Sequence, residues 1–159
     1  MTIRNLVHAF EPKSLALIGA SSRMGSVGAV VLDNILKGGF EGDIWPVNPK
    51  YTELRCRRCH ASVSDIPGIP DLAILMTPPD PIPDLIGELG SKGTRAAVVL
   101  TAGLTRENGL RQKMLDAARP HLLRIIGPNS IGLMVPPAKL NAGFFHMAAL
   151  SGDIALLSQ

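Results

Sequence analysis

The sequence predicts a doubly wound α/β domain, in which a mainly parallel sheet carries helices on both faces. Short apolar runs alternate with segments of helical periodicity along almost the whole chain. The apolar runs read as continuous Val, Ile and Leu rather than as alternating apolar and polar residues, which is typical of parallel strands buried on both faces. With 159 residues, the chain has the length of one domain with a substantial core.

The predicted elements follow one another in the order strand, helix, strand. The strands span residues 15–18, 43–47, 72–76, 96–100 and 123–126. The helices span residues 27–36, 83–92 and 107–119. Gly38 and Gly39 end the first helix and Gly93 ends the second, because glycine readily adopts the left-handed conformation that terminates a helix. Residues 3–10 are expected to form a short amphipathic helix that serves packing.

The pattern loosens after Val135, and only residues 153–159 read as a further strand. We therefore expect residues 1–135 to form the domain, and residues 136–159 to hold a connection and the first strand of a following domain. A chain that stops directly on a strand lacks the helix that would cover it. For this reason we expect a fragment of a longer polypeptide.

Charge and hydropathy argue against nucleic-acid and membrane partners. The net charge is only +3, and the densest basic cluster, Arg55, Arg57 and Arg58, has no interleaved aromatic residues for base stacking, so we interpret it as a solvated loop. No apolar run approaches the roughly 20 residues that span a bilayer, and the N-terminus lacks the apolar core of a signal peptide. We expect a cytoplasmic protein whose two cysteines stay reduced.

The loops that follow the predicted strands are the candidate binding site, because ligands of doubly wound sheets bind beyond the carboxyl ends of the strands. These loops read "GASSRMG", "NPKY", "MTPPD", "TAGLT" and "GPNSIG". Each is rich in Gly, Pro, Ser, Thr or Asn, which turn sharply and leave backbone groups free. The sequence therefore places the site at one edge of the sheet.

The turn after the first predicted strand is a candidate anion site. Gly19, Gly25 and Gly28, with Ser21 and Ser22, let backbone N–H groups approach an anion at a helix N-terminus, where the helix macrodipole also favours negative charge. The six-residue step from Gly19 to Gly25 differs from the G-x-G-x-x-G of dinucleotide-binding turns. The turn predicts a phosphate-bearing ligand without identifying it.

The end of the second predicted strand narrows the ligand to two classes. A domain that binds NAD has an Asp or Glu there, which accepts hydrogen bonds from the ribose hydroxyls. Here the strand is followed by Asn48, Pro49 and Lys50. A lysine favours a phosphorylated ribose, because its cation makes a charge-assisted hydrogen bond to the phosphate. From the residues alone, NADP and coenzyme A (CoA) both remain open.

Seven segments, spread in order from about Phe10 to the last residue, carry a family resemblance. They read "PKSLALIGAS", "VGAVVLDNILKGGFEGDIWPVNPKY", "PDLAIL", "AAVVLTAG", "RIIGPNSIGL", "LNAGF" and "GDIALLSQ". Together they resemble the CoA-binding, Rossmann-like domain of the NDP-forming acyl-CoA synthetases, the family that includes the alpha subunit of succinyl-CoA synthetase. The resemblance implies a domain that binds CoA or an acyl-CoA such as acetyl-CoA, with further domains downstream in the same polypeptide.

The resemblance also implies which residues bind the ligand. The family's first CoA loop falls on residues 21–24, its phosphate-binding lysine on Lys50, and its contacts after a later strand on residues 100–102. The family's "GPN" motif falls on residues 127–129. The expected CoA-binding residues are Gly19, Ser21, Ser22, Arg23, Met24, Gly25, Asn48, Lys50, Leu100, Thr101, Ala102 and Asn129.

Two kinds of parent protein share these motifs. Synthetases mostly continue GPN with Cys, whereas this chain has Ser130. The chain resembles at least as closely the synthetase-like region of bacterial protein lysine acetyltransferases that are fused to a GNAT domain. The segments that carry this second resemblance are "GPNSIGL", "PDLAIL" and "LNAGF". The resemblance implies either acyl phosphate formation through a phosphorylated histidine, followed by attack of the CoA thiol, or acetyl transfer from acetyl-CoA to a lysine.

Both reactions need residues beyond Gln159, so we expect no catalytic residue in this chain alone. The histidines here lie outside any matching motif: His8, His60, His121 and His146.

Two other patterns are interpreted as incidental. Cys56, Cys59 and His60 spell the C-x-x-C-H of c-type haem attachment, but that reaction requires export, for which the sequence has no signal, and a tetrahedral zinc site lacks a second pair of ligands. Ser21 and Ser22 lack the flanking G-x-S-x-G of a hydrolase nucleophile. We expect neither a metal nor nucleophilic catalysis.

The sequence thus predicts a CoA- or acyl-CoA-binding domain of an acyl-CoA synthetase or of a GNAT-fused acetyltransferase. One alternative is an NADP-binding redox or sensor domain. The other is a stand-alone CoA-binding module without chemistry of its own.

Overall fold

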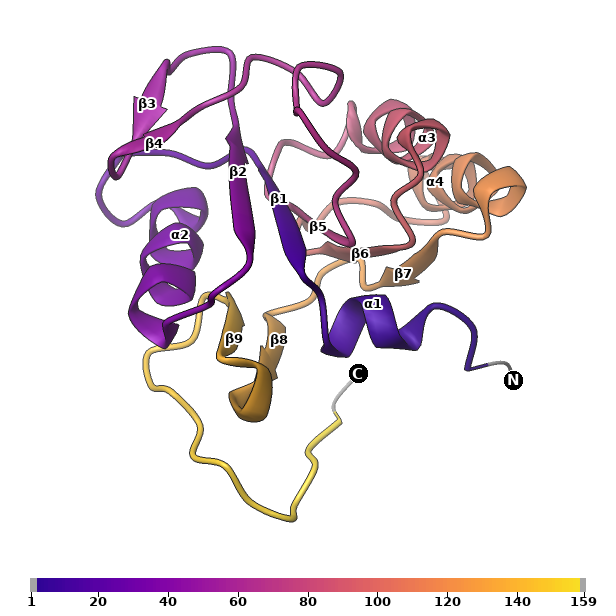
Figure 1. Ribbon diagram of the computed structural model, residues 1–159. Helices are drawn as coiled ribbons and strands as arrows, with labels where there is room; N and C mark the ends of the chain where they lie inside the picture. The colour runs from indigo at the N-terminus through magenta and orange to yellow at the C-terminus, as the bar shows by residue number, and fades with distance from the viewer. Residues whose placement is uncertain (1–2, 158–159) are drawn as a thin grey trace.

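The computed structural model describes residues 3–157 and has a five-stranded parallel sheet at its centre, in the order β2-β1-β5-β6-β7 (Figure 1). The predicted doubly wound, Rossmann-like fold is confirmed, and the five strands predicted between residues 15 and 126 appear within one residue of their expected ends. The strands are β1 (Ser14–Ile18), β2 (Asp43–Val47), β5 (Leu72–Leu75), β6 (Ala96–Val99) and β7 (Arg124–Ile126).

The inner strands are apolar because both faces of the sheet are covered. Every residue of β1, β5 and β6 is buried, which explains why their sequences do not alternate. β2 is an edge strand and tolerates Pro46. The carbonyl of Pro46 accepts a hydrogen bond from the N–H of His60, on the side away from β1, so the N–H that proline lacks would also face away from β1.

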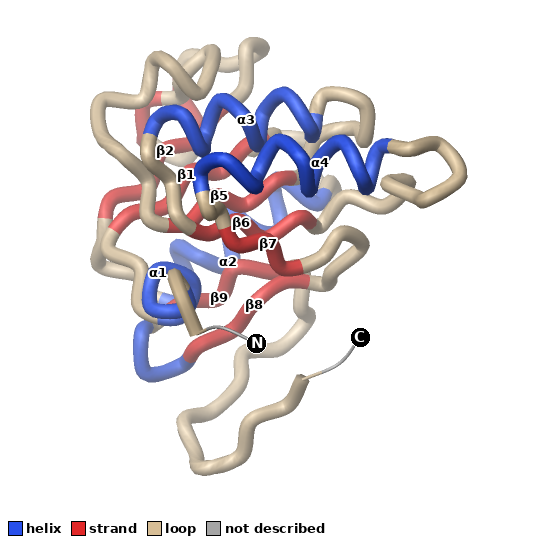
Figure 2. The backbone as a smooth tube through the Cα atoms, turned by 90° about the vertical axis from the view of Figure 1, so that its right-hand side faces the viewer, coloured by secondary structure: helices blue, strands red, loops and turns tan. Residues whose placement is uncertain are grey.

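The two faces of the sheet carry different layers (Figure 2). α3 (Ile82–Lys92) and α4 (Leu110–Ala118) cover one face. The other face carries α2 (Val27–Gly38) beside a hairpin of β8 (Gly132–Val135) and β9 (Leu140–Gly143). This hairpin was not predicted from the sequence, and it occupies the place of a second helix.

The helices begin and end at identifiable residues. Gly39 ends α2 with φ +76° and Gly93 ends α3 with φ +110°, as the sequence predicts. α4 begins three residues later than expected, because Gly109 has φ +72° and Asn108 Oδ1 accepts a hydrogen bond from the N–H of Leu110 at 3.0 Å. The N-terminal helix α1 (Leu6–Phe10) is also shorter than expected.

The predicted strand over residues 153–159 is wrong where the structure describes it. Residues 153–157 form no strand and are exposed, and residues 158–159 lie outside the described part of the chain. The boundary expected after Val135 remains a prediction, although Leu140 and Ala142 of β9 belong to the same apolar cluster as the buried face of α2. Two single-turn 3-10 helices complete the fold: Arg119–His121 and Pro136–Ala138.

A second unpredicted hairpin, formed by β3 (Glu53–Leu54) and β4 (Arg57–Arg58), is a separate two-stranded sheet that lies beyond β2 (Figure 1). Its chain continues into His60, which bridges Val47 of β2 in the parallel direction. Among the described residues, no helix is long and apolar enough to cross a membrane.

The turn of this hairpin holds two non-glycine residues in the left-handed region, Arg55 at φ +51° and Cys56 at φ +58°. Replacing Cys56 by glycine is expected to stabilise the fold by about 1 kcal/mol, because glycine has no Cβ to penalise this conformation. Urea unfolding of Cys56→Gly checks this, with Cys56→Ala as the matched control. Equal stabilities of the two variants would contradict the prediction.

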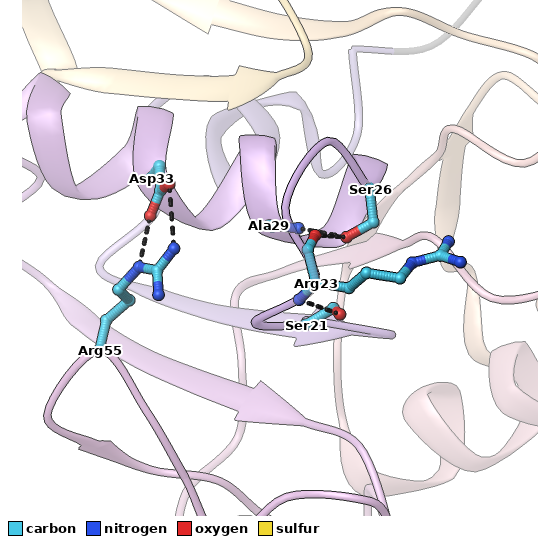
Figure 3. Close-up of polar contacts among 6 residues, drawn as sticks. All are labelled: Ser21, Arg23, Ser26, Ala29, Asp33 and Arg55. Carbon is cyan, nitrogen blue, oxygen red and sulfur yellow. Dashed lines mark hydrogen bonds and ion pairs between the residues drawn. The ribbon is translucent and has the colours of Figure 1, made fainter.

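Arg55 also joins the hairpin to α2 through an ion pair with Asp33 (Figure 3). Arg55 Nε lies 2.7 Å from Asp33 Oδ1, and a second bond of 3.2 Å joins Nη2 to Oδ2. The hydrogen bond from Arg55 holds the pKa of the Asp33 carboxyl below its ordinary value. This contact therefore stabilises the fold above the ordinary carboxyl pKa and loses its effect as the pH falls through the lowered one.

Asp33→Asn is expected to lower the free energy of unfolding by about 0.5–1 kcal/mol at pH 7, the range of a partly exposed ion pair, and by less near pH 3, which is below the ordinary carboxyl pKa. Urea titrations at both pH values measure the difference. Asp153→Asn, on the exposed C-terminal segment, is the control and is expected to leave both values unchanged. A loss of equal size at both pH values would show that the charge of Asp33 does not act.

Candidate functional site

The carboxyl ends of the five parallel strands meet at one edge of the sheet, where the strand order reverses between β1 and β5. In doubly wound sheets, this reversal opens a crevice in which ligands bind. Five loops surround it, and they are the five that the sequence indicates. Gly19 lies against the β5 loop so closely that a Cβ there would meet the Thr77 backbone nitrogen at 3.1 Å.

The turn between β1 and α2 is ordered by serine hydrogen bonds (Figure 3). Ser21 Oγ accepts from the N–H of Arg23 at 3.0 Å, and Ser26 Oγ donates to the Arg23 carbonyl at 2.7 Å. Ser26 is the N-cap of α2, since its Oγ also lies 3.3 Å from the N–H of Ala29. The side chain of Arg23 extends away from α2 and is exposed (Figure 3).

The N-terminus of α2 leaves donors free for an anion. The N–H groups of Val27 and Gly28 have no hydrogen-bond partner within residues 3–157. They belong to the first turn of a 12-residue helix, whose dipole favours negative charge at this end. The turn thus has the chemistry of a phosphate site.

Gly28 permits the close packing on which this turn depends. A Cβ at Gly28 would lie 2.2 Å from the carbonyl oxygen of Gly19 and 3.2 Å from the nitrogen of Ser21. Both neighbours are backbone atoms of the same turn, so any side chain at Gly28 would displace the turn from the helix.

Two side chains link the loop after β2 to the turn between β1 and α2, which we call the glycine turn. Asn48 Nδ2 donates to the carbonyl of Ala20 at 2.8 Å, while Asn48 Oδ1 accepts from the N–H of Lys50 at 3.0 Å. The hydroxyl of Tyr51 lies 3.3 Å from Ser21 Oγ. This hydrogen bond holds the pKa of the Tyr51 phenol below its ordinary value. The nitrogen and the oxygen of the Asn48 amide are thus both hydrogen-bonded within the protein, to Ala20 and Lys50.

The remaining loops are linked in the same way. Thr101 Oγ1 donates to the carbonyl of Thr77 at 2.7 Å, and the carbonyl of Thr101 accepts from the N–H of Asn129 at 3.0 Å. Thr77 Oγ1 is buried and has no hydrogen-bond partner within the described residues. Leu100 is only 6% exposed, so its side chain belongs to the core. Ala102 is exposed.

The structure thus brings the twelve predicted residues to one edge of the sheet, in four of the five loops, and distinguishes their roles. Arg23 and Lys50 are exposed cations, and neither is in an ion pair within the described part of the chain. Met24, at the tip of the glycine turn, is 96% exposed. Arg23, Lys50 and Met24 are therefore available to a ligand, whereas Asn48 and Leu100 support the loops.

Sequence reasoning missed three residues that shape the site: Ser26, Tyr51 and Thr77. Ser26 carried a readable signal, because a serine directly before a helical segment is a preferred N-cap. Tyr51 and Thr77 had no such signal, since their contacts join loops that are distant in sequence.

The cysteines of the C-x-x-C-H pattern lie outside this edge. Cys56 is exposed at the β3–β4 turn, while Cys59 is buried. Burial raises the pKa of the Cys59 thiol.

A cavity of about 630 Å³ lies at the opposite edge of the sheet, near Lys13 and Gly42, and shares no residue with the candidate site.

The fold and the site define a class of protein, namely a Rossmann-like domain that binds a phosphate-bearing nucleotide ligand at the carboxyl edge of its sheet. Residues 13–136 match the family model described as a CoA binding domain. The chain belongs to this family, as the sequence resemblance predicts.

Relatives of known name support the same assignment. The chain is 37% identical over 158 residues to the alpha subunit of the ADP-forming acetate–CoA ligase I of Pyrococcus furiosus, a match that covers 94% of this chain and 34% of that subunit. It is 38% identical over 150 residues to the ADP-forming acetate–CoA ligase of Methanocaldococcus jannaschii, covering 93% of this chain and 21% of the ligase.

A solved structure shows the same fold. The dinucleotide-forming acetyl-coenzyme A synthetase 1 of Candidatus Korarchaeum cryptofilum, solved in complex with phosphate and ADP, superposes with a TM-score of 0.87 and 36% identity over 93% of this chain. The match covers 32% of the synthetase chain. The present chain thus spans about a third or less of the relatives that it matches.

Proposed function

We propose that the chain binds CoA at the carboxyl edge of its sheet, as the CoA-binding part of an ADP-forming acyl-CoA ligase. The observation that carries the proposal is the turn between β1 and α2, where the unpaired N–H groups of Val27 and Gly28 face the same edge as two unpaired cations, Arg23 and Lys50. A ligand with several phosphates matches this arrangement. Family membership selects CoA among such ligands.

In this proposal the chain's own residues bind and orient the nucleotide end of CoA. The pyrophosphate lies on the glycine turn, held by backbone N–H groups and Arg23, while Lys50 binds the phosphate on the ribose. Ser21, Ser22, Gly19 and Gly25 shape the turn. When bound, CoA supplies the thiol that accepts an acyl group, and no residue of the chain takes part in that chemistry.

The parent reaction is proposed to be ligation of a carboxylic acid to CoA, driven by conversion of ATP to ADP and phosphate. It is proposed to take place in the cytoplasm, with the other domains of the ligase as partners. The relatives above are named as ligases or synthetases, and this favours the ligase over the acetyltransferase that the sequence left open. Acetate is the proposed acid and acetyl-CoA the proposed thioester.

Calorimetric titration with CoA, acetyl-CoA, NADPH and NADH tests the proposal. Saturable binding of CoA or acetyl-CoA, without binding of either nicotinamide nucleotide, is the expected result. Binding of NADPH alone would support the redox alternative and contradict the proposal. If none of the four ligands bound, binding by this chain alone would be contradicted.

A further inference from the structure

A second cavity, which is polar, lies on the side of β2 that faces away from β1. It has a volume of about 390 Å³ and is formed by β2, the β3–β4 hairpin and residues 60–67. We call it the hairpin cavity. Trp45, Arg57, Arg58, His60, Asp43 and Asp65 contribute to its lining.

Neither arginine of the hairpin cavity forms an ion pair with a described residue, although Arg58 acts electrostatically on the Asp65 carboxylate. Arg55, at the turn, is held by Asp33, whereas Arg57 and Arg58 are exposed and form no ion pair with any described residue. From the sequence alone, these arginines were expected to lie in a solvated loop. In the fold they instead flank a cavity, and a guanidinium is well suited to bind an oxyanion through paired N–H groups.

His60 adds a buried polar group to the same cavity. The residue is only 6% exposed, and its ring Nδ1 is buried without a hydrogen-bond partner among residues 3–157. Buried polar atoms without a hydrogen-bond partner are uncommon in folded proteins, and their presence calls for an explanation such as a ligand. Arg58 and His60 are two residues apart on an extended segment, so their side chains leave the same face of the chain.

The acidic residues of the cavity are placed so that an anion can still bind. Asp43 begins β2, four residues before Val47, which pairs with His60; four residues of strand span about 13 Å. Asp65 lies nearer, but its Oδ2 already accepts from the N–H of Ser62 at 3.0 Å and from Ser62 Oγ at 2.7 Å. Arg58 is close enough to act electrostatically on the Asp65 carboxylate, so Asp65 is the group with which a bound anion competes, while Arg57 and Arg58 supply the positive charge of the cavity.

We propose that the hairpin cavity binds a small oxyanion, a phosphate or a carboxylate group, between Arg58 and the ring of His60, with Arg57 adding positive charge to the cavity lining. The indole of Trp45 forms part of the wall against which the rest of the molecule packs. This site is separate from the CoA site and does not depend on it.

Fluorescence of Trp45, the only tryptophan in the sequence, reports on this cavity directly. The chain is titrated with potassium phosphate and, separately, with potassium acetate, each against potassium chloride at the same ionic strength. Each titration is repeated with saturating CoA. A saturable change with phosphate or acetate, absent with chloride and retained with CoA, is expected, and the better of the two identifies the group.

Four variants sharpen the test. The exposed pair Arg57→Ala/Arg58→Ala is expected to weaken binding at least about tenfold, because the charge-assisted hydrogen bonds are lost. Asp65→Asn is expected to tighten binding about threefold, because a competing negative charge is removed. Arg119→Ala, an exposed arginine at the end of α4, and Lys50→Ala, in the CoA site, are expected to leave binding unchanged.

Three results would overturn the proposal. They are a response no different from that to chloride, an equal response in the double arginine variant, and a response abolished by CoA or by Lys50→Ala. The last would show that the anion binds in the CoA site. Because the titrations without CoA do not require CoA to bind, a failure of the proposed function leaves this test intact.

Discussion

Gly28→Ala is expected to destabilise the domain by roughly 2–3 kcal/mol, the cost of forcing extra volume into a closely packed position. The added Cβ would lie 2.2 Å from the carbonyl oxygen of Gly19, so either α2 or the glycine turn must move. Because the proposed pyrophosphate site is made of that turn and the first turn of α2, CoA binding is expected to be lost together with stability. Urea unfolding and calorimetry measure the two effects.

Gly87→Ala on α3 is the matched control. A Cβ at Gly87 would meet only Ala117 Cβ at 4.0 Å, an ordinary contact. This variant is expected to gain about 0.5–1 kcal/mol from helix propensity and to bind CoA as the unmodified chain does. If the two alanine variants unfolded at the same urea concentration, close packing at Gly28 would not be the reason for its glycine.

Lys50→Ala is expected to weaken CoA binding by about 1.5–3 kcal/mol, the scale of a hydrogen bond between charged groups. Lys50 is exposed and has no ion-pair partner within the described residues, so its removal leaves no buried charge behind. The fold is therefore expected to remain intact. Lys113→Ala, an exposed lysine on α4, is the control and is expected to bind CoA normally.

Dephospho-CoA identifies the group that Lys50 binds. If Lys50 contacts the 3′-phosphate, the substitution is expected to be nearly silent toward dephospho-CoA, because the two changes remove the same interaction. An equal loss of affinity for both ligands would assign Lys50 to another part of CoA.

The central sheet could be predicted because its signals are local. β1, β5 and β6 are buried along their whole length and therefore read as unbroken apolar runs. The two hairpins lacked such a signal. β3 and β4 have two residues each, and every residue of β8 is only partly buried, so neither hairpin produces a continuous apolar run.

The strand predicted over residues 153–159 shows the opposite error. Ile154, Leu156 and Leu157 form an apolar pattern, yet each is more than 90% exposed. Hydrophobic periodicity predicts which residues have something to bury, but not whether a surface is present to bury them. Residues 153–157 contact no such surface within the described chain.

The position of the candidate site could be predicted from the sequence, whereas the contacts that its residues make could be predicted only in part. Loop composition located the edge of the sheet, and Lys50 and Arg23 lie there with free side chains. Asn48 has the composition of a ligand residue, but its amide is engaged by Ala20 and Lys50. Such engagement depends on the approach of two loops, which a single sequence does not reveal.

The central position of β1 has a consequence for how the chain folds as it is synthesised. β1 is the first strand made, and it pairs on one side with β2 and on the other with β5, where Ile18 is opposite Leu75. At least one edge of this wholly buried strand must therefore lack its native partner until Leu75 has left the ribosome. An open strand edge invites pairing with other chains, so the nascent domain is exposed to aggregation, and to chaperones, until β5 is available to pair with β1.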